Sequence, residues 1–163
     1  MKIKFRDGSI KDFETLYNAN LYNANLSYAN LSYANLVNAN LVNANLRYAN
    51  LVNANLSYAN LYNADLRYAN LVNANLSYAN LYNADLRYAK GILSFIGEKD
   101  LLVYFKYNNI YYFKIGCITR TLDYWKENFK EIGIKQNYDS ETIKLYGDVI
   151  ELFSKYDLDH GKK

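Results

Sequence analysis

Residues 46–65 read LRYANLVNANLSYANLYNAD, and residues 66–85 repeat those twenty letters without a change. A leucine stands at every fifth position of this stretch, and the same spacing holds for fifteen leucines from Leu16 to Leu86. Fifteen alanines keep the spacing from Ala19 to Ala89. A period of five within a period of twenty indicates a repeat architecture in which four pentapeptides make one structural unit.

A period of five fits neither a helix nor a straight strand. In an α-helix, five residues turn the side chain by about 500°, so the leucines would wind around every face. In one strand, an odd step sends alternate leucines to opposite faces. Ala19 and Leu21, however, lie two residues apart and share a face of a short extended segment, while Asn20 faces away. A bend at the two residues after each leucine then predicts a four-sided coil, with coils stacked about 4.8 Å apart.

In such a coil the leucines and alanines point to one axis and form a dry core. Burial of each leucine contributes roughly 1.5–3 kcal/mol, against about 1–2 kcal/mol of backbone entropy for each ordered residue. One coil alone is therefore unstable, and stability must come from stacking. The predicted core includes Leu21, Leu26, Leu46, Leu56, Leu66, Ala24, Ala44 and Ala64.

The A-[N/D]-L-x-x run from Ala19 to Ala89 resembles the pentapeptide repeat family, and it covers nearly half of the chain. The resemblance implies a mainly β fold, a right-handed quadrilateral β-helix, with leucine as the central inward residue and alanine as the small one. The length corresponds to a β-solenoid of about four coils of 20 residues. The regular part ends near Lys90, because Gly91 stands where the next leucine would fall.

The composition bounds the remaining choices. The chain has 163 residues, 51% of them hydrophobic, which suits one compact unit with a small appended domain. It has neither an apolar signal segment nor a run of about eighteen apolar residues, so we expect a cytoplasmic protein without membrane contact. Cys117 is the only cysteine, and with His160 it cannot supply a zinc ligand set or a complete catalytic group. We therefore expect no metal, no cofactor and no enzymatic activity.

Residues 1–15 are predicted to cap the first coil, and residues 16–90 to form the β-helix. Lys2 to Phe5 and Ser9 to Phe13 alternate apolar and polar residues around Asp7-Gly8, which is typical of a hairpin. Such a cap covers backbone groups that would otherwise recruit other chains. The side chains expected to sit on the first coil are Ile3, Phe5, Ile10 and Phe13.

Residues 91–163 are predicted to form a small α+β domain. It begins with a cluster expected to plug the last coil, followed by a hairpin of 101–107 and 110–116 around Asn108-Asn109 and by two amphipathic helices. We expect Gly133 to end the first helix and Asp139 or Ser140 to begin the second. The plug comprises Ile92, Leu93, Phe95 and Ile96; the helix stripes comprise Leu122, Trp125, Phe129 and Ile132, then Ile143, Tyr146, Ile150 and Phe153.

About 70 residues bury too little surface to be stable alone, so this domain should pack on the solenoid end or pair with a second copy as a homodimer. Both possibilities stay open, with capping favoured because Ile92–Ile96 follow the last coil without a linker. The residues Ile115-Gly116-Cys117, followed by Thr121, Leu122 and Trp125, are similar to tails of pentapeptide repeat proteins of phage or prophage type. That resemblance implies no activity.

A register of twenty also aligns surface residues into columns. The most distinctive surface feature is a possible interaction face that consists of Arg47, Arg67, Arg87, Tyr48, Tyr68 and Tyr88. Arginine binds phosphate and aromatic rings stack on bases, which would suit an anion or a nucleic acid. The alternative is a solvated surface in which Asp65 and Asp85 neutralise arginines and the tyrosines stack on each other. Asparagine columns are expected to hydrogen-bond from coil to coil.

Charge decides between the functional alternatives. Some pentapeptide repeat proteins mimic DNA and bind DNA gyrase, but a mimic of about 18 Å needs about ten acidic groups. Residues 16–90 contain only Asp65 and Asp85, against three arginines and Lys90. Gyrase binding and weak nucleic-acid or anion binding are therefore alternatives. The leading hypothesis is a non-catalytic structural or protein-interaction module whose partner is another protein or a second copy.

Overall fold

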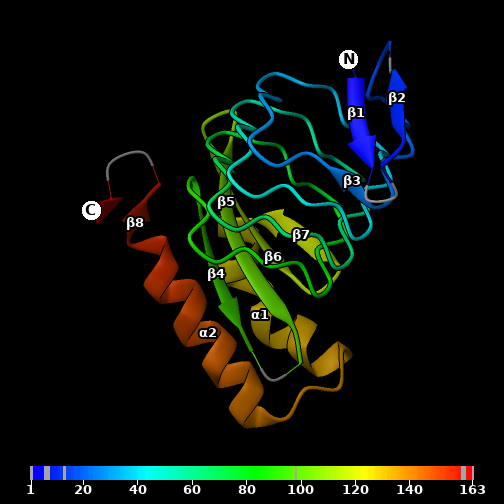
Figure 1. Ribbon diagram of the computed structural model, residues 1–163. Coiled ribbons are helices and arrows are strands. Elements are labelled where there is room, and N and C mark those ends of the chain that lie inside the picture. The colour runs from blue at the N-terminus through cyan, green and yellow to red at the C-terminus, as the bar shows by residue number, and fades with distance from the viewer. Residues whose placement is uncertain (1, 6–7, 13, 98, 159–160, 163) are drawn as a thin grey trace.

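The computed structural model describes residues 2–5, 8–12, 14–97, 99–158 and 161–162 of the chain. Figure 1 shows a stack of coils that begins at the N-terminus, then a four-stranded sheet, then a pair of helices. The sheet lies between the coils and the helices.

Each pentapeptide makes one tight turn of the backbone. In the repeat that begins at Leu21, the Ala24 N–H donates to the Leu21 carbonyl at 3.0 Å, and Asn23 has a φ of 56°. These are the features of a type II turn. Asn20 accepts the N–H of Tyr22 on its Oδ1 at 3.2 Å, which fixes the start of the turn. The third turn residue is asparagine or tyrosine in every repeat, with φ between 54° and 62°.

The coils stack in a register of twenty residues. Parallel bridges connect residues twenty apart, from Asn20–Asn40 to Asn70–Lys90. Backbone bonds run in both directions between coils: the Leu21 N–H donates to the Asn40 carbonyl at 2.8 Å, and the Asn40 N–H donates to the Ala19 carbonyl at 2.9 Å. The repeat region is therefore a β-helix solenoid, as predicted.

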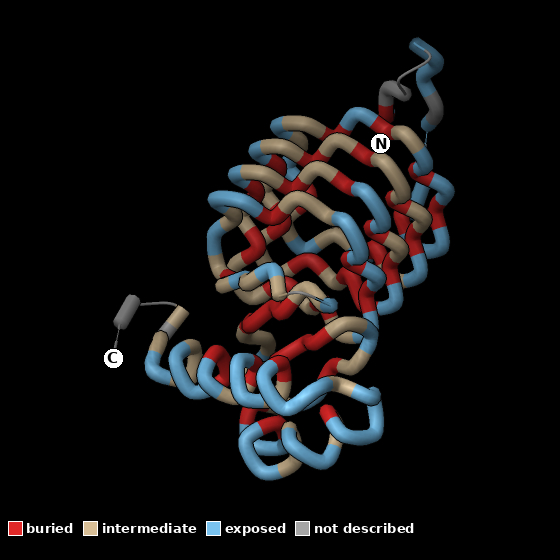
Figure 2. The backbone as a smooth tube through the Cα atoms, turned by 90° about the horizontal axis from the view of Figure 1, so that it is seen from below, coloured by how far each residue is buried: buried red, intermediate tan, exposed pale blue. Residues whose placement is uncertain are grey.

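The interior of the solenoid is made of the repeated leucines and alanines. Figure 2 shows the buried positions recurring from coil to coil along the inner side of the tube. Exposed fractions are 0% for Leu21, Leu46, Leu56, Leu66 and Ala24, 1% for Ala44 and Ala64, and 3% for Leu26. Apolar burial of this extent is the main stabilising contribution to the coils.

An antiparallel hairpin covers the first coil. Strands β1 (Lys2–Phe5) and β2 (Ile10–Asp12) pair with each other, and β1 also pairs with β3 (Ala24–Asn25). Ile3 is 2% exposed and joins the solenoid core. The expectation for Ile10 was wrong: it is 64% exposed, because the register places it opposite Lys4, on the face of the sheet other than that of buried Ile3.

The prediction for three residues of the hairpin cannot be compared with the structure. Asp7 and Phe13 lie outside the described residues, and of Phe5 only the backbone is described.

A four-stranded antiparallel sheet follows the last coil in the order β4-β5-β6-β7. Its strands are β4 (Ile92–Ile96), β5 (Leu101–Tyr107), β6 (Ile110–Ile115) and β7 (Ile118–Thr121). The predicted hairpin is confirmed as β5 and β6, with positive φ at Asn108 and Asn109. Strands β4 and β7 were not predicted.

The predicted plug is wrong in most of its residues. Only Ile92 joins the solenoid core. Leu93 and Phe95 pack on the opposite side of the sheet, and Ile96 is 81% exposed. Leu93 and Phe95 leave the solenoid core because the segment is a strand, whose successive side chains alternate between the two faces. Ile96 shares the face of Ile92, but it is the last residue of β4.

Strand β5 instead joins the two cores of the molecule. Val103 and Phe105 are fully buried in the cluster that contains the solenoid leucines. Leu102 and Tyr104 are fully buried in a second cluster together with the helices. Because both faces of the sheet are covered, the C-terminal residues cap the solenoid, which is the alternative that the sequence favoured.

The two predicted helices are present as α1 (Leu122–Lys135) and α2 (Ser140–Ser154), and they cover the far side of the sheet. Asp139 is the N-cap of α2, and its carboxylate accepts the Thr142 N–H at 2.7 Å. Gly133 does not end α1. It is buried inside the helix, where a Cβ would lie 2.6 Å from Cγ1 of Ile143; close packing, not termination, explains this glycine.

Two short strands, β8 (Tyr156–Asp157) and β9 (Gly161–Lys162), follow α2 and pair with each other. Neither α1 nor α2 combines the length and apolar character that crossing a membrane requires, and the same holds throughout the described chain.

Candidate interaction face

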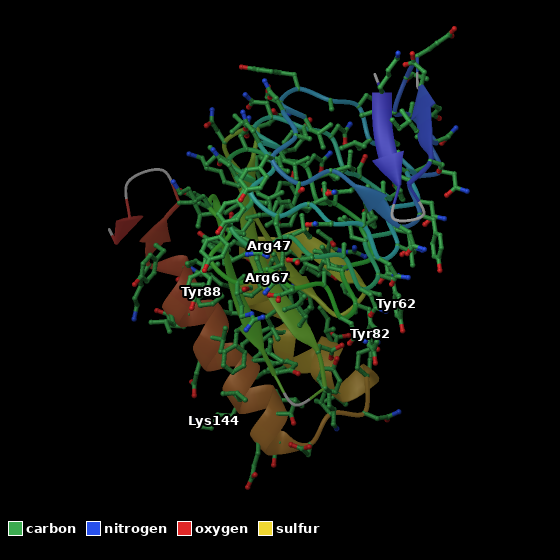
Figure 3. All side chains as sticks on the ribbon, in the orientation of Figure 1. Arg47, Tyr62, Arg67, Tyr82, Tyr88 and Lys144 are labelled. Carbon is green, nitrogen blue, oxygen red and sulfur yellow. The ribbon has the colours of Figure 1, made fainter. Side chains whose placement is uncertain are left out.

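The face predicted from the repeat register is formed by one column of turns. Arginine occupies the second position and tyrosine the third position of the turns that begin at Leu46, Leu66 and Leu86. We call this column, Arg47, Arg67, Arg87, Tyr48, Tyr68 and Tyr88, the Arg/Tyr face. Figure 3 shows Arg47 and Arg67 one above the other on the side of the coils.

The tyrosines of this face stack along the solenoid. The Tyr48 and Tyr68 ring centroids are 4.8 Å apart with planes inclined by 7°, and Tyr68 and Tyr88 are 4.9 Å apart. Tyr28 extends the stack at 4.9 Å from Tyr48. The predicted stacking of tyrosine on tyrosine is thus present. Since the inner rings are covered on both faces by neighbours, they offer solvent their edges and hydroxyls and cannot stack on a base.

The stack also offsets a backbone cost. Tyr48, Tyr68 and Tyr88 have φ of 59° to 62°, a region that disfavours residues with a large side chain. Such a conformation costs on the order of 1–3 kcal/mol, while a stacked aromatic pair contributes about 0.5–1.5 kcal/mol beyond its buried area. The tyrosines therefore have a structural role in this column.

A ladder of alternating charges runs beside the tyrosines. Arg67 donates from Nε and Nη2 to the two carboxylate oxygens of Asp65, at 2.8 and 2.6 Å. Arg87 holds Asp85 in the same way, at 2.9 and 2.6 Å. Nε of Arg67 also lies 3.4 Å from the carboxylate of Asp85, in the next coil. The predicted neutralisation is confirmed, and the link between coils adds to it.

These contacts shift the ionisation of the ladder. Hydrogen bonds from Arg67 lower the pKa of Asp65, and hydrogen bonds from Arg87 lower the pKa of Asp85, in both cases against a smaller opposing effect of burial. The bond to Asp65 raises the pKa of Arg67 in turn. The ladder thus holds three guanidinium groups against two carboxylates, which leaves one net positive charge.

Arg47 is the incompletely paired member of the ladder. Neutral Asn45 stands where Arg67 and Arg87 have an aspartate, and it accepts only the backbone N–H of Arg47, at 3.1 Å. The nearest carboxylate, that of Asp65, is 4.0 Å from Nε. This Nε is buried and has no hydrogen-bond partner. The sequence shows this difference directly, because residue 45 is asparagine while the equivalent residues of the next two coils are Asp65 and Asp85.

Asparagine ladders account for other columns. Asn40 donates from Nδ2 to Oδ1 of Asn20 at 3.3 Å, so the predicted bonds between coils are present. Asn73 donates to Asn53 at 2.6 Å, and its own Oδ1 accepts the N–H of Asn108 at 3.0 Å. One asparagine ladder thus continues from the solenoid into the turn between β5 and β6.

Of the remaining candidate pair, Cys117 and His160, the structure describes only the cysteine. Cys117 is exposed in the turn between β6 and β7, and His160 lies outside the described residues. Within those same described parts, no three His, Cys, Asp or Glu side chains gather as metal ligands would. The residues around Cys117 have structural roles: Thr121 caps α1, and Trp125 donates to the Phe113 carbonyl at 2.7 Å.

The chain is similar to known repeat proteins over its solenoid. A family model described as pentapeptide repeats matches residues 19–57 and 54–90, with eight copies. No curated protein gives a significant match.

The solved structures that are similar to this chain include the following three. HetL, a pentapeptide repeat protein involved in heterocyst differentiation regulation in Nostoc sp. PCC 7120, is 37% identical over 46% of this chain and 41% of its own, with a TM-score of 0.25. Rfr23 from Cyanothece 51142 is 36% identical over 52% of this chain and 73% of its own, with a TM-score of 0.28. A protein of the Arabidopsis thaliana thylakoid lumen is 26% identical over 58% and 61%, with a TM-score of 0.26. The alignment thus spans less than half of HetL.

Proposed function

Because this chain belongs to the pentapeptide repeat family, we propose that it is a non-catalytic structural and protein-interaction module. Members of the family generally act through protein interactions and not through catalysis. Here the module is a solenoid that presents its terminal α+β domain to a protein partner. A second copy of the chain, bound through that domain, is the alternative partner.

One observation carries this proposal: β5 contributes side chains to both cores. Phe105 packs with the solenoid leucines, and Tyr104, next to it, packs with the helices. Side-chain packing is therefore continuous from the helices, through β5, to the coils. In this arrangement the solenoid and the sheet form a rigid support for α1 and α2, which lie on the far side of the sheet.

The proposal includes finer features of the architecture. We propose a right-handed coil with four sides and about four coils. One turn per pentapeptide in a register of twenty supports four sides, and the handedness follows from the family resemblance. Residues 1–15, 16–90 and 91–163 are the proposed cap, solenoid and terminal domain. The cytoplasmic location stays a prediction.

Weak anion binding by the Arg/Tyr face is a second candidate, because Arg47 lacks the paired carboxylate that its neighbours have. The net charge of this face is small and its inner rings are covered, so we expect no specific nucleic-acid binding at physiological salt. Single-stranded DNA that binds tightly, with an affinity that falls steeply with salt and vanishes when Arg47, Arg67 and Arg87 are changed to serine, would favour this candidate instead. The same positive balance argues against DNA mimicry and gyrase binding.

The interaction module is tested by capture from an extract of the native host. The immobilised full chain is incubated with nuclease-treated extract at physiological salt, and the retained proteins are identified by mass spectrometry. We expect at least one protein to be retained in defined stoichiometry, with or without the triple arginine substitution. Retention of nothing, or of nucleic acid alone in an untreated extract, would refute the proposal.

A further inference from the structure

A groove of about 610 Å³ runs between α1 and α2. The helix pair lies at the end of the molecule opposite the N-terminal hairpin (Figures 1 and 2). Its lining includes the apolar side chains of Phe129, Ile143 and Ile150 and the lysines Lys126, Lys130 and Lys144. Figure 3 shows Lys144 on α2, far from the Arg/Tyr face. The groove is thus a separate surface.

The floor of the groove is apolar because the two helices approach closely. A Cβ on Gly147 would lie 2.5 Å from the Phe129 ring, so the ring packs directly against the backbone of α2. Phe129 and Ile143 remain half-buried, and neither reaches the full burial of the adjacent Trp125. Apolar side chains left partly open at the bottom of a groove are suited to burial by a partner.

The charges on the two sides of the groove are unequal. On α2, Lys144 pairs with Asp148 at 2.8 Å and Glu151 pairs with Lys155 at 3.4 Å. On α1, the lysines at positions 126 and 130 have no carboxylate within ion-pair distance among the described residues. They stand four residues apart, and so one helical turn apart on the same side of α1. Two positive groups without a carboxylate partner therefore lie along one side of the groove, and the Lys130 ammonium lies 5.8 Å from the centroid of the Phe129 ring.

We propose that this groove binds an amphipathic helix of a protein partner, one with carboxylates along one flank of its apolar face. Its apolar residues cover Phe129 and Ile143, and two acidic residues four apart meet Lys126 and Lys130. An apolar helix face laid in a groove is a common mode of peptide recognition. The complementary charges fix the side and direction of the helix, because rim charges contribute mainly to specificity. This inference rests on the proposed interaction function and locates its binding surface.

The test uses a synthetic helical peptide of about four turns with the full-length protein. The peptide has leucines along one face and two glutamates four residues apart on one flank; a matched peptide has lysines in place of the glutamates. We expect the acidic peptide to bind at least about tenfold more tightly by fluorescence anisotropy. We also expect it to shift the amide resonances of Phe129, Ile143 and Gly147.

Charge reversal in the protein provides the decisive comparison. The double variant Lys126→Glu and Lys130→Glu should invert the preference, so that the lysine peptide binds more tightly. A control with the same change of net charge, Lys2→Glu and Lys90→Glu, alters two exposed lysines of the hairpin and the solenoid and should leave the preference unchanged. Both variants replace exposed side chains, and far-UV circular dichroism verifies their fold.

Three results obtained with the purified protein would overturn the inference. The first is equal affinity for the two peptides, and the second is an unchanged preference in the groove variant. The third is a dimer in light scattering that dissociates in the groove variant, because a second copy would then occupy the groove.

A protein captured from the host extract and retained equally by the groove variant would refute binding in the groove but leave the interaction module standing. Failure of any capture refutes the module itself.

Discussion

Replacement of Phe105 by alanine should destabilise the whole chain, because this ring closes the core of the solenoid from the side of the sheet. Phe105 is fully buried among the solenoid residues, and its ring centroid is 5.3 Å from that of Tyr112. Such a truncation costs about 3–5 kcal/mol, a large part of the about 5–15 kcal/mol that stabilises a domain. With a urea slope of about 2 kcal/mol per M, the unfolding midpoint should fall by about 2 M.

Urea unfolding is followed by two signals. Trp125 is the only tryptophan and reports on the terminal domain, while circular dichroism reports on all of the secondary structure. The two transitions should coincide in the wild type, because one packed body unfolds cooperatively. Ile96→Ala, on the same sheet but 81% exposed, should change stability by no more than about 0.5 kcal/mol. A midpoint for Phe105→Ala equal to that of this control would refute the reasoning.

Three further predictions concern the solenoid. Asn45→Asp should give Arg47 a carboxylate and raise stability by up to about 1 kcal/mol in urea unfolding; a lower midpoint at neutral pH would argue against the ladder. The pKa values of Asp65 and Asp85 are lowered in the folded chain, so their contribution is complete above the unfolded value near 4 and is lost as pH falls through the folded value. The wild type should be more stable than the double variant Asp65→Asn and Asp85→Asn at neutral pH, and this difference in the free energy of unfolding should shrink in acid. A difference that grew in acid would contradict the lowered pKa values. Leu56→Lys should abolish folding, since the charge would have no partner in the dry core; a cooperative melt with a near-wild-type midpoint would place the leucine elsewhere.

The repeat pattern allowed much of the fold to be predicted, because each position of the pentapeptide has the same structural role in every repeat. Leu21 and Ala24 enclose a turn whose third residue needs a positive φ, and Asn23 tolerates it. Repetition of this unit sets the register, and the register sets the arginine and tyrosine columns. The contact between Asp65 and Arg67 could be predicted because the two residues lie on one short extended segment and its turn.

The parts that could not be predicted depend on contacts between distant segments. Residues 92–96 read as an apolar plug, and only pairing with β5 reveals a strand with two different faces. Gly133 reads as a helix stop, yet it is required by the approach of Ile143 from α2. The helix groove has no sequence signal either. Lys126 and Lys130 are ordinary surface residues until the contacts of α2 show that the two carboxylates lining the groove, Asp148 and Glu151, already have lysine partners.

Light scattering of a chain that ends at Lys90, beside the full-length protein, tests the capped solenoid most directly. Removal of residues 91–163 would expose the leucines of the last coil, now covered by Val103 and Phe105, together with an open backbone edge. The shortened chain should aggregate while the full-length protein stays monodisperse. A soluble, monodisperse and fully folded chain ending at Lys90 would contradict the account.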